Sequence, residues 1–276
     1  MRDMETLTLN TGFEIPQLGF GVFEIPPEDT VECVNVALDA GYRHIDTARI
    51  YDNEAQVGEA LMTTRVPREE IFVTTKLWNS DQGYDSTIRA FETSMDKLGL
   101  EYLDLYLIHW PVAGSDGYIE TWEAMESLHA AGRIRSIGVS NFQRAHLEHL
   151  IEQCEVVPAV NQIEIHPYLV QTEVRQAGSD HGIATEAWSP LAQGTLSDDP
   201  LLEEIASKHG RSVADIALAW NLALDNVVLT RSSNPERIRS NFTVTEIELD
   251  DDEITRISNL DRGGRVGPHP ETYSLA

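Results

Sequence analysis

The stretch Gly41–Glu54, GYRHIDTARIYDNE, decides the fold of this chain. It begins with a glycine, continues as a short predicted strand at Arg43–Asp46, and then reaches Tyr51 on the following loop. In a (β/α)8 barrel, the reactive side chains lie where strands end and the loops to the next helices begin. The stretch therefore has the layout of one edge of an active site in such a barrel.

Outward from this stretch, short apolar runs alternate with amphipathic runs along almost the whole chain. The predicted strands are Gly19–Phe23, Arg43–Asp46, Ile71–Lys76, Leu103–His109, Ile134–Val139, Val160–Ile165, Ala184–Trp188 and Val227–Thr230. The predicted helices begin near Pro26 and continue with Glu54–Leu61, Tyr84–Leu98, Tyr118–Ala131, Arg144–Gln153, Thr172–Asp180, Leu201–His209 and Val213–Leu224. Strands that alternate with helices indicate right-handed βαβ units and a parallel sheet. An open doubly wound sheet is an alternative, but the eight predicted strands and the lack of a visible boundary favour closure into a barrel.

Further elements are predicted at both ends of the chain, outside the strand–helix repeat. The segment Leu7–Phe23 predicts a short hairpin, with its turn at Thr11–Gly12, that leads into the first strand. The acidic run Glu246–Glu253 precedes a further helical pattern, and the Gly- and Pro-containing tail Asp261–Ala276 predicts an irregular segment that folds back over the barrel mouth. We therefore predict an α/β fold: one (β/α)8 TIM-barrel domain over residues 1–276 with an N-terminal β-hairpin and extra C-terminal helices.

Acidic residues far outnumber basic ones. The 46 Asp and Glu against 20 Lys and Arg give a net charge of −26 and a pI of about 4.5. Such a chain repels nucleic acid phosphates and anionic lipids, so we expect neither nucleic-acid nor membrane partners. The hydrophobic content of 41% argues against disorder. Molar salt shortens the Debye length to about 3 Å, so surface carboxylates repel each other less. Together with the small number of lysines, the acidic composition favours a protein from the cytoplasm of a halophile.

Cysteine usage and the termini point to the same compartment. Only Cys33 and Cys154 occur, which argues against a disulfide framework. No apolar run is long enough to span a membrane, and Met1–Gly12 lacks the apolar core of a signal peptide. We expect a cytoplasmic protein, and a monomer because no exposed apolar helix face stands out.

Four polar residues fall at or just after the ends of consecutive predicted strands: Asp46, Tyr51, Lys76 and His109. Each has an ordinary structural interpretation, respectively a turn cap, a rim aromatic, a surface ion pair and a core histidine. Consecutive barrel strands, however, place their C-terminal ends side by side. We therefore predict that the four side chains meet and form a catalytic group.

Together the four side chains form a proton-transfer device. Tyrosine is a weak acid with a reference pKa of about 10, and a nearby Lys76 ammonium is expected to lower the pKa of Tyr51. Asp46 would keep Lys76 charged, and His109 would donate a hydrogen bond to the carbonyl of a small-molecule substrate. Tyr51 would then protonate the carbonyl oxygen as a hydride reaches the carbon. Because no side chain supplies a hydride, a reduced nicotinamide is required.

Several sequence motifs, which follow one another in a fixed order along the chain, are consistent with this chemistry. They are GYRHIDTA, YDNE and VG within Gly41–Gly58, TKLW at Thr75–Trp78, LDLYLIHWP at Leu103–Pro111, IGVSNF at Ile137–Phe142 and NQIEIHPYL at Asn161–Leu169. This set resembles the aldo-keto reductase superfamily. The resemblance implies a (β/α)8 barrel that binds NADPH or NADP+ in an extended form without a Rossmann domain. It also assigns Asp46, Tyr51, Lys76 and His109 to the family's catalytic tetrad.

The resemblance also implies the residues that hold the cofactor. Ser140, Asn141 and Gln162 correspond to residues that hydrogen-bond the nicotinamide carboxamide, although turn capping is an ordinary alternative for the first two. Trp188 stands where many members carry a tyrosine that stacks on the nicotinamide, and tryptophan there resembles the 2,5-diketo-D-gluconate reductase branch. The implied contacts to the nicotinamide and pyrophosphate are Gly21, Val22, Ser140, Asn141, Gln162, Trp188, Ser189, Leu191 and Gln193.

The segment Thr230–Asn241, TRSSNPERIRSN, is a basic island in an acidic chain. The residues that match the family's 2′-phosphate and adenine contacts are Arg231, Ser232, Arg237 and Asn241. Arginine suits a phosphate because its planar fork donates two hydrogen bonds. We interpret Arg239 as an ordinary solvated helix charge. The island favours NADPH over NADH.

Substrate selection is less specified by the sequence. Phe23, Trp78 and Trp110, together with His109, would line the pocket by family position. The short Val112–Gly117 segment replaces the longer substrate loops of some relatives and predicts an open site for small aldehydes and ketones, keto-sugars among them.

Two other functional classes are also considered. The first is a regulatory or structural protein that binds the cofactor with little turnover, as some relatives of the superfamily do. The second is a metal-dependent barrel hydrolase built from His44, His109 and His166, which lie near strands. The sequence lacks the carboxylate–histidine spacing of a zinc site, so we expect no metal.

Overall fold

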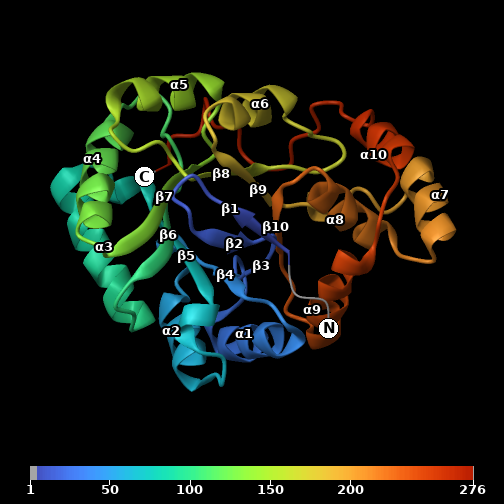
Figure 1. Ribbon diagram of the computed structural model, residues 1–276, viewed down its shortest axis with the longest axis horizontal. Helices are drawn as coiled ribbons and strands as arrows, with labels where there is room; N and C mark the ends of the chain where they lie inside the picture. The colour runs from blue at the N-terminus through green and yellow to red at the C-terminus, as the bar shows by residue number, and fades with distance from the viewer. Residues whose placement is uncertain (1–4, 276) are drawn as a thin grey trace.

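The computed structural model describes residues 5–275 and contains a closed barrel of parallel strands (Figure 1). The barrel strands are β3 (Leu18–Gly21), β4 (His44–Asp46), β5 (Phe72–Leu77), β6 (Leu103–Ile108), β7 (Ile134–Ser140), β8 (Val160–Glu164), β9 (Ala184–Trp188) and β10 (Val227–Thr230). They follow one another around the barrel in chain order, and β10 pairs with β3 to close it. The predicted (β/α)8 barrel is confirmed, and the open doubly wound alternative is wrong.

The helices surround the barrel. They are α1 (Pro27–Ala40), α2 (Glu54–Thr63), α3 (Tyr84–Leu98), α4 (Gly117–Ala130), α5 (Arg144–Gln153), α6 (Thr172–Asp180), α7 (Pro200–His209), α8 (Val213–Ala223), α9 (Pro235–Phe242) and α10 (Asp251–Ser258). Most of their ends lie within about two residues of the predicted ones. The predicted helical pattern after the acidic run is α10, whose N-cap Asp250 accepts a hydrogen bond from the backbone N–H of Glu253. α10 lies beyond α9, the helix that follows the last barrel strand β10, and is therefore an extra C-terminal helix.

Gly41, the first residue of the deciding stretch, makes the sharp turn from α1 into β4. Its φ of 116° is a left-handed conformation that favours glycine. A Cβ at this position would also lie 2.6 Å from the ring of Phe242 in α9. Glycine is therefore required both by the backbone and by the close approach of the last part of the chain.

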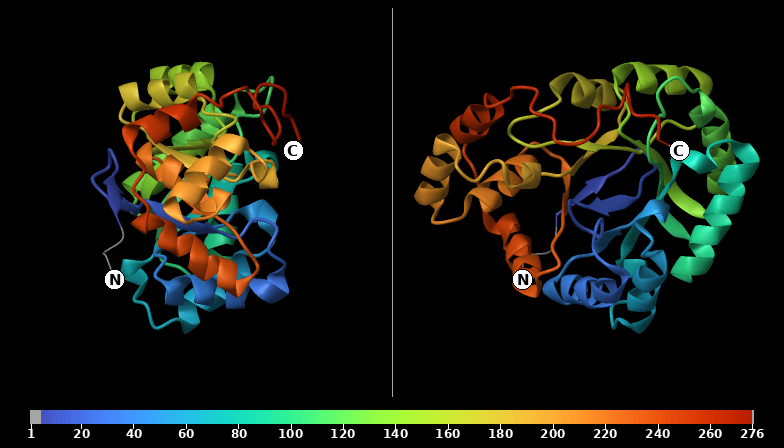
Figure 2. Two further views of the ribbon diagram at one scale, coloured as in Figure 1. Left: turned by 90° about the vertical axis from the view of Figure 1, so that its right-hand side faces the viewer. Right: turned by 180° about the vertical axis from the view of Figure 1, so that it is seen from behind.

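The N-terminal hairpin closes one end of the barrel. Strands β1 (Thr6–Thr8) and β2 (Glu14–Pro16) pair in antiparallel fashion, which confirms the predicted hairpin. Its buried Leu9 and Ile15 join the cluster that contains Phe72 and Val160, the first residues of β5 and β8. Figure 2 shows the hairpin and the C-terminal tail at opposite ends of the barrel. The far end, where the strands finish, is thus left for the functional site.

Side chains along a strand point alternately into and out of the barrel, and this alternation determines which of them fill its interior. On β5, Lys76 reaches Asp46 inside the barrel, whereas its neighbour Thr75 points outward and donates a hydrogen bond to Glu54 of α2. Lys76 and Asp46 thus lie on the inward faces of β5 and β4. Among residues 5–275, no helix is long and apolar enough to cross a membrane, and the first four residues of the predicted signal-free N-terminus lie outside the described part.

Candidate active site

Three of the four predicted catalytic side chains are joined by direct contacts at the ends of β4 and β5. The fully buried Lys76 donates from Nζ to Asp46 Oδ1 at 2.6 Å and to the carbonyl of Thr47 at 2.9 Å. The same Nζ lies 3.4 Å from the Tyr51 hydroxyl. An ammonium group placed between a carboxylate and a phenol is suited to control the proton on that phenol.

The pKa directions at this site follow from burial and charge. Burial is the largest influence on the pKa of Lys76 and lowers it, but Asp46, together with smaller effects of Tyr51 and Glu186, outweighs burial and the net shift is upward. Lys76 therefore stays protonated at neutral pH. Withdrawal from water raises the pKa of Tyr51, and the opposing effect of Lys76 is smaller. The predicted lowering effect of Lys76 on the pKa of Tyr51 is present, but the burial around the phenol, which the sequence did not reveal, makes the net shift upward.

His109, the fourth member, completes the group from the end of β6. Its ring centroid lies 5.7 Å from that of Tyr51 and 5.2 Å from that of Trp78. Burial, followed by the charge of Lys76, holds the pKa of His109 well below its usual range, so the imidazole is neutral at pH 7. Its Nδ1 is buried and has no partner among the described residues. A neutral histidine next to the phenol can donate one hydrogen bond to a substrate oxygen.

The three predicted amide and hydroxyl contacts lie side by side on the neighbouring strands. Ser140 Oγ donates to the carbonyl of Gln162 at 2.9 Å, and Asn141 Nδ2 donates to the carbonyl of His109 at 3.0 Å. Trp188 Nε1 donates to Asn141 Oδ1 at 2.9 Å. Neutral groups of this kind match an uncharged carboxamide. Asn141 adopts a φ of 65°, which is a conformation that asparagine tolerates.

The remaining positions expected to contact the pyrophosphate and nicotinamide differ in exposure. Ser189 and Leu191 are partly buried, and Gln193 is exposed on a short turn where φ is 52°. Gly21 ends β3 beside Asp46 of β4. Val22 is fully buried, and its N–H and carbonyl are bonded to Asp46 and Asn53, so its side chain is not open to solvent at the mouth.

The basic island Thr230–Asn241 begins at the last residue of β10 and includes nearly all of α9. Arg231 donates from Nε to the carbonyl of Phe23 at 2.7 Å and pairs through Nη2 with the Glu24 carboxylate at 3.1 Å. Arg231 and Arg237 are exposed, whereas Ser232 and Asn241 are partly buried, on the loop and helix that follow β10. The structure thus shows a carboxylate that competes for Arg231, which the sequence pattern did not reveal.

Aromatic side chains gather around the tetrad. The ring of Phe23, which is 53% exposed, lies 5.0 Å from the ring of Tyr51. Trp110 is nearly buried, and it stacks near His109 at 6.5 Å and packs on Tyr273 of the C-terminal tail at 4.4 Å. The expected pocket residues Phe23, Trp78 and Trp110 therefore lie around the tetrad.

The C-terminal tail folds over the barrel mouth, as the sequence predicts (Figure 2). Glu164, buried at the end of β8, accepts hydrogen bonds from the backbone N–H groups of Val266 and Gly267 at 2.6 and 3.0 Å. The carbonyl of Tyr273 accepts from Ala113 N on the loop after β6. Glu164 thus anchors the segment that brings Tyr273 to the pocket.

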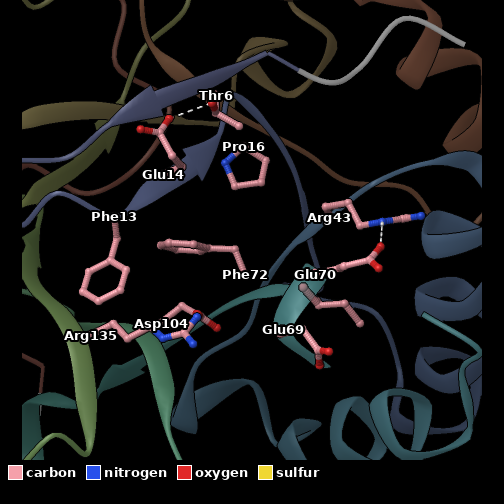
Figure 3. Close-up of a pocket in the computed structure, with 11 residues that line it drawn as sticks. Thr6, Phe13, Glu14, Pro16, Arg43, Glu69, Glu70, Phe72, Asp104 and Arg135 are labelled. Atoms are coloured by element: carbon pink, nitrogen blue, oxygen red, sulfur yellow. Dashed lines mark hydrogen bonds and ion pairs between the residues drawn. The ribbon is translucent and has the colours of Figure 1, made fainter. Parts of the chain in front are cut away.

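A separate hollow of about 360 Å³ opens at the opposite end of the barrel. Figure 3 shows Phe13, Phe72 and Arg135 in its wall, below the N-terminal hairpin. Phe72 begins β5, whereas Lys76 lies near the end of the same strand. This hollow therefore lies away from the tetrad and contributes no residue to it.

The three histidines considered for a metal site do not cluster. His44 pairs with Thr74, and His166 pairs with Glu164, while His109 faces Tyr51 and Trp78. Within the described residues, no group of three or more His, Cys, Asp and Glu side chains could hold a metal ion. The geometry lends no support to the hydrolase alternative.

The protein is an α/β barrel with the candidate site at its mouth, and comparisons with known proteins give its family. A model of the aldo/keto reductase family matches residues 17–262. An aldo-keto reductase from Mycolicibacterium smegmatis is 54% identical over 269 residues, covering 98% of each chain. The glyoxal reductase of Bacillus subtilis is 47% identical over 268 residues, covering 97% of this chain and 96% of that protein. This chain belongs to the aldo/keto reductase family.

Solved structures agree with this assignment. A mutant of Gox0644 in complex with NADPH superimposes with a TM-score of 0.94 at 44% identity, and the match covers 99% of each chain. The predicted family and the predicted cofactor class, NADP(H), are confirmed at this level.

Sequence reasoning missed three residues that the structure brings to the site. Glu186 contacts Gln162 from within β9, Glu24 pairs with Arg231, and Tyr273 packs on Trp110. A signal for Glu186 was present, because a glutamate in the middle of a strand predicted to be buried is unusual. Glu24 and Tyr273 carry no such signal, since each meets its partner only through the fold.

Proposed function

We propose that this protein is an NADPH-dependent reductase of small aldehydes and ketones, with Asp46, Tyr51, Lys76 and His109 as its catalytic group. The contact of Lys76 Nζ with both Asp46 and the Tyr51 hydroxyl carries the proposal. NADPH, when bound, supplies the hydride. Ser140, Asn141 and Gln162 would hold its carboxamide, and Arg231 and Arg237 would hold its 2′-phosphate.

The four residues divide the work. His109, neutral at pH 7, orients the substrate by a hydrogen bond to the carbonyl oxygen. Tyr51 gives its proton to that oxygen, and Lys76 stabilises the phenolate that remains. Asp46 keeps Lys76 charged and in place. The raised pKa of Tyr51 keeps the phenol protonated and ready to donate at neutral pH.

The substrate class is the open part of the proposal. Trp188 and the short Val112–Gly117 segment favour the diketogluconate reductase type, and the glyoxal reductase of Bacillus subtilis is a close match. A panel of glyoxal, simple aldehydes and keto-sugars, assayed by loss of NADPH absorbance, tests both possibilities. A preference for keto-sugars would support a function like that of the diketogluconate reductases. Preference for glyoxal would place the protein with small dicarbonyl reductases. Tight NADPH binding without turnover would favour the regulatory alternative.

Replacing Arg231 with alanine is expected to weaken NADPH binding by about 10- to 100-fold, since hydrogen bonds to charged groups contribute about 1.5–3 kcal/mol each. NADH binding should change little because it lacks the 2′-phosphate. Fluorescence titration with both cofactors measures the ratio. The matched control is Arg239→Ala, which replaces an exposed arginine on α9 whose side chain donates to the carbonyl of Pro235 in its own helix. Equal loss of both cofactors in Arg231→Ala would contradict the assignment.

We further propose a monomeric, single-domain protein of a halophile's cytoplasm, on the basis of the net charge of −26. The melting temperature is expected to rise by roughly 5 °C or more between about 0.1 and 2 M KCl, because salt screens repulsion between surface carboxylates. Scanning calorimetry measures this, and an equally viscous sucrose series separates ionic screening from solvent exclusion. Full stability and activity at low salt, unchanged by KCl, would contradict the halophilic interpretation.

A further inference from the structure

A glutamate lies inside the barrel beneath the tetrad, and the proposed mechanism does not use it. Glu186 occupies the middle of β9 and shares the inward face of that strand with Trp188, because alternate residues of a strand face the same side. Its side chain is fully buried, and in the parallel ladder it lies beside Gln162 of β8. Burying a carboxyl group without a cationic partner costs free energy. The presence of Glu186 at this position therefore indicates a functional role.

The contacts of Glu186 determine how Gln162 is oriented. Gln162 Nε2 donates to Glu186 Oε2 at 2.7 Å and to Asp46 Oδ2 at 3.0 Å. An amide nitrogen has two hydrogens, so both are taken by these two carboxyl groups. The Asp46 carboxylate can only accept hydrogen bonds, so the reversed amide would place its oxygen against this acceptor. The pair therefore fixes Gln162 with Oε1 directed away from both Glu186 and Asp46.

The surroundings of Glu186 keep it neutral. Burial, reinforced by the charge of Asp46, raises the pKa of Glu186 to about 8. His44 Nε2, 3.7 Å from Glu186 Oε1, is bonded to Thr74, and burial followed by the charge of Lys76 lowers the pKa of His44 to about 3. Glu186 Oε1 has no hydrogen-bond partner among the described residues. An uncharged carboxyl beside an uncharged imidazole needs no counter-ion.

We propose that Glu186 is a positioning residue for carbonyl reduction: it holds the Gln162 amide so that Oε1 accepts a hydrogen bond from the nicotinamide carboxamide. This inference rests on the proposed function. In its neutral form Glu186 also leaves Asp46 as the one carboxylate charge beside Lys76. Glu186 touches neither substrate nor cofactor in this role and acts through Gln162.

Ionisation of Glu186 is expected to make Tyr51, the proposed general acid, a weaker acid. The titratable groups that face it are Asp46 and His44 on β4, Lys76 on β5 and, farther out, Tyr51, while its β10 neighbours Val227 and Val228 are apolar. A negative charge on Glu186 raises the pKa of both Lys76 and Tyr51. Tyr51 becomes a weaker acid, so the reduction rate should fall as the pH rises through about 8.

The first test measures NADPH affinity by fluorescence titration, which needs no turnover. Glu186→Leu removes the acceptor at similar volume and is expected to weaken NADPH about tenfold. Glu186→Gln keeps an acceptor for Gln162 and should restore most of the affinity. The matched control is Glu54→Leu, which removes a buried glutamate bonded to Thr75 on the outer face of the barrel. It should lower stability and leave NADPH affinity unchanged.

The second test is the pH profile of the rate at saturating NADPH and carbonyl. The wild type should lose activity as pH rises through about 8, and Glu186→Gln should not, because the amide cannot ionise. This comparison stands even if Glu186→Leu fails to fold. The positioning role would be overturned if the reduction rate fell equally at high pH in the wild type and Glu186→Gln, or if folded Glu186→Leu bound NADPH with normal affinity. Either result would leave the reductase proposal intact. A wild type that binds no NADPH would overturn both.

Discussion

Replacing Tyr51 with phenylalanine is expected to slow carbonyl reduction by about 10²- to 10⁴-fold, the usual contribution of a general acid. The change removes only the hydroxyl that lies 3.4 Å from Lys76 Nζ. The ring keeps its packing against Phe23 and His109, so the fold and NADPH binding should be nearly unchanged. Single-turnover loss of NADPH absorbance measures the chemical step directly.

The control for this variant is Tyr84→Phe. Tyr84 is 42% exposed on α3, and its hydroxyl bonds Ser127 away from the mouth. Its loss should leave the rate at the wild-type value. A Tyr51→Phe enzyme that reduces carbonyls as fast as the wild type would contradict the role of Tyr51 as the acid.

Replacing Lys76 with methionine is expected to abolish measurable reduction and also to destabilise the fold by about 3–5 kcal/mol, the usual cost of leaving a buried charge unpaired. Lys76 is fully buried, and its removal leaves the Asp46 carboxylate without its partner at 2.6 Å. Urea unfolding, read together with the rate, separates the two effects.

A double variant distinguishes pairing from packing. Adding Asp46→Asn to Lys76→Met removes the orphaned charge, so much of the lost stability should return while the activity stays absent. As a surface control, Arg144→Met breaks the exposed Arg144–Glu148 pair and should leave stability nearly unchanged. If the double variant were no more stable than Lys76→Met alone, the destabilisation would reflect lost packing rather than an unpaired carboxylate.

The barrel could be predicted because its strands and helices carry strong local signals. Strands β9 and β10 match their predicted bounds, since short segments between helical patterns leave little freedom in where a strand begins and ends. Helix α9 was not predicted as an element. Its eight residues contain only two apolar side chains that pack on the core, Ile238 and Phe242, so its apolar repeat is short, and Asn234 capping and packing on α1 also hold it.

The candidate site could be predicted as far as strand ends reveal it. Asp46, Lys76 and His109 stand at or next to strand ends, and parallel strands bring such ends together. Burial was not visible in the sequence, so the predicted lowering effect of Lys76 on the pKa of Tyr51 did not give the direction of the net shift. Contacts between distant segments were also hidden: Arg231 meets Glu24, and Tyr273 meets Trp110, only once the barrel closes.

The most direct test of the account compares NADPH consumed with alcohol formed, for the wild type and Tyr51→Phe, using glyoxal in high-salt buffer. The account predicts one alcohol per NADPH oxidised by the wild type, and a rate lower by about 10² or more in Tyr51→Phe with NADPH still bound. Binding of NADPH without alcohol from any carbonyl of the panel, or equal rates in the two proteins, would contradict it.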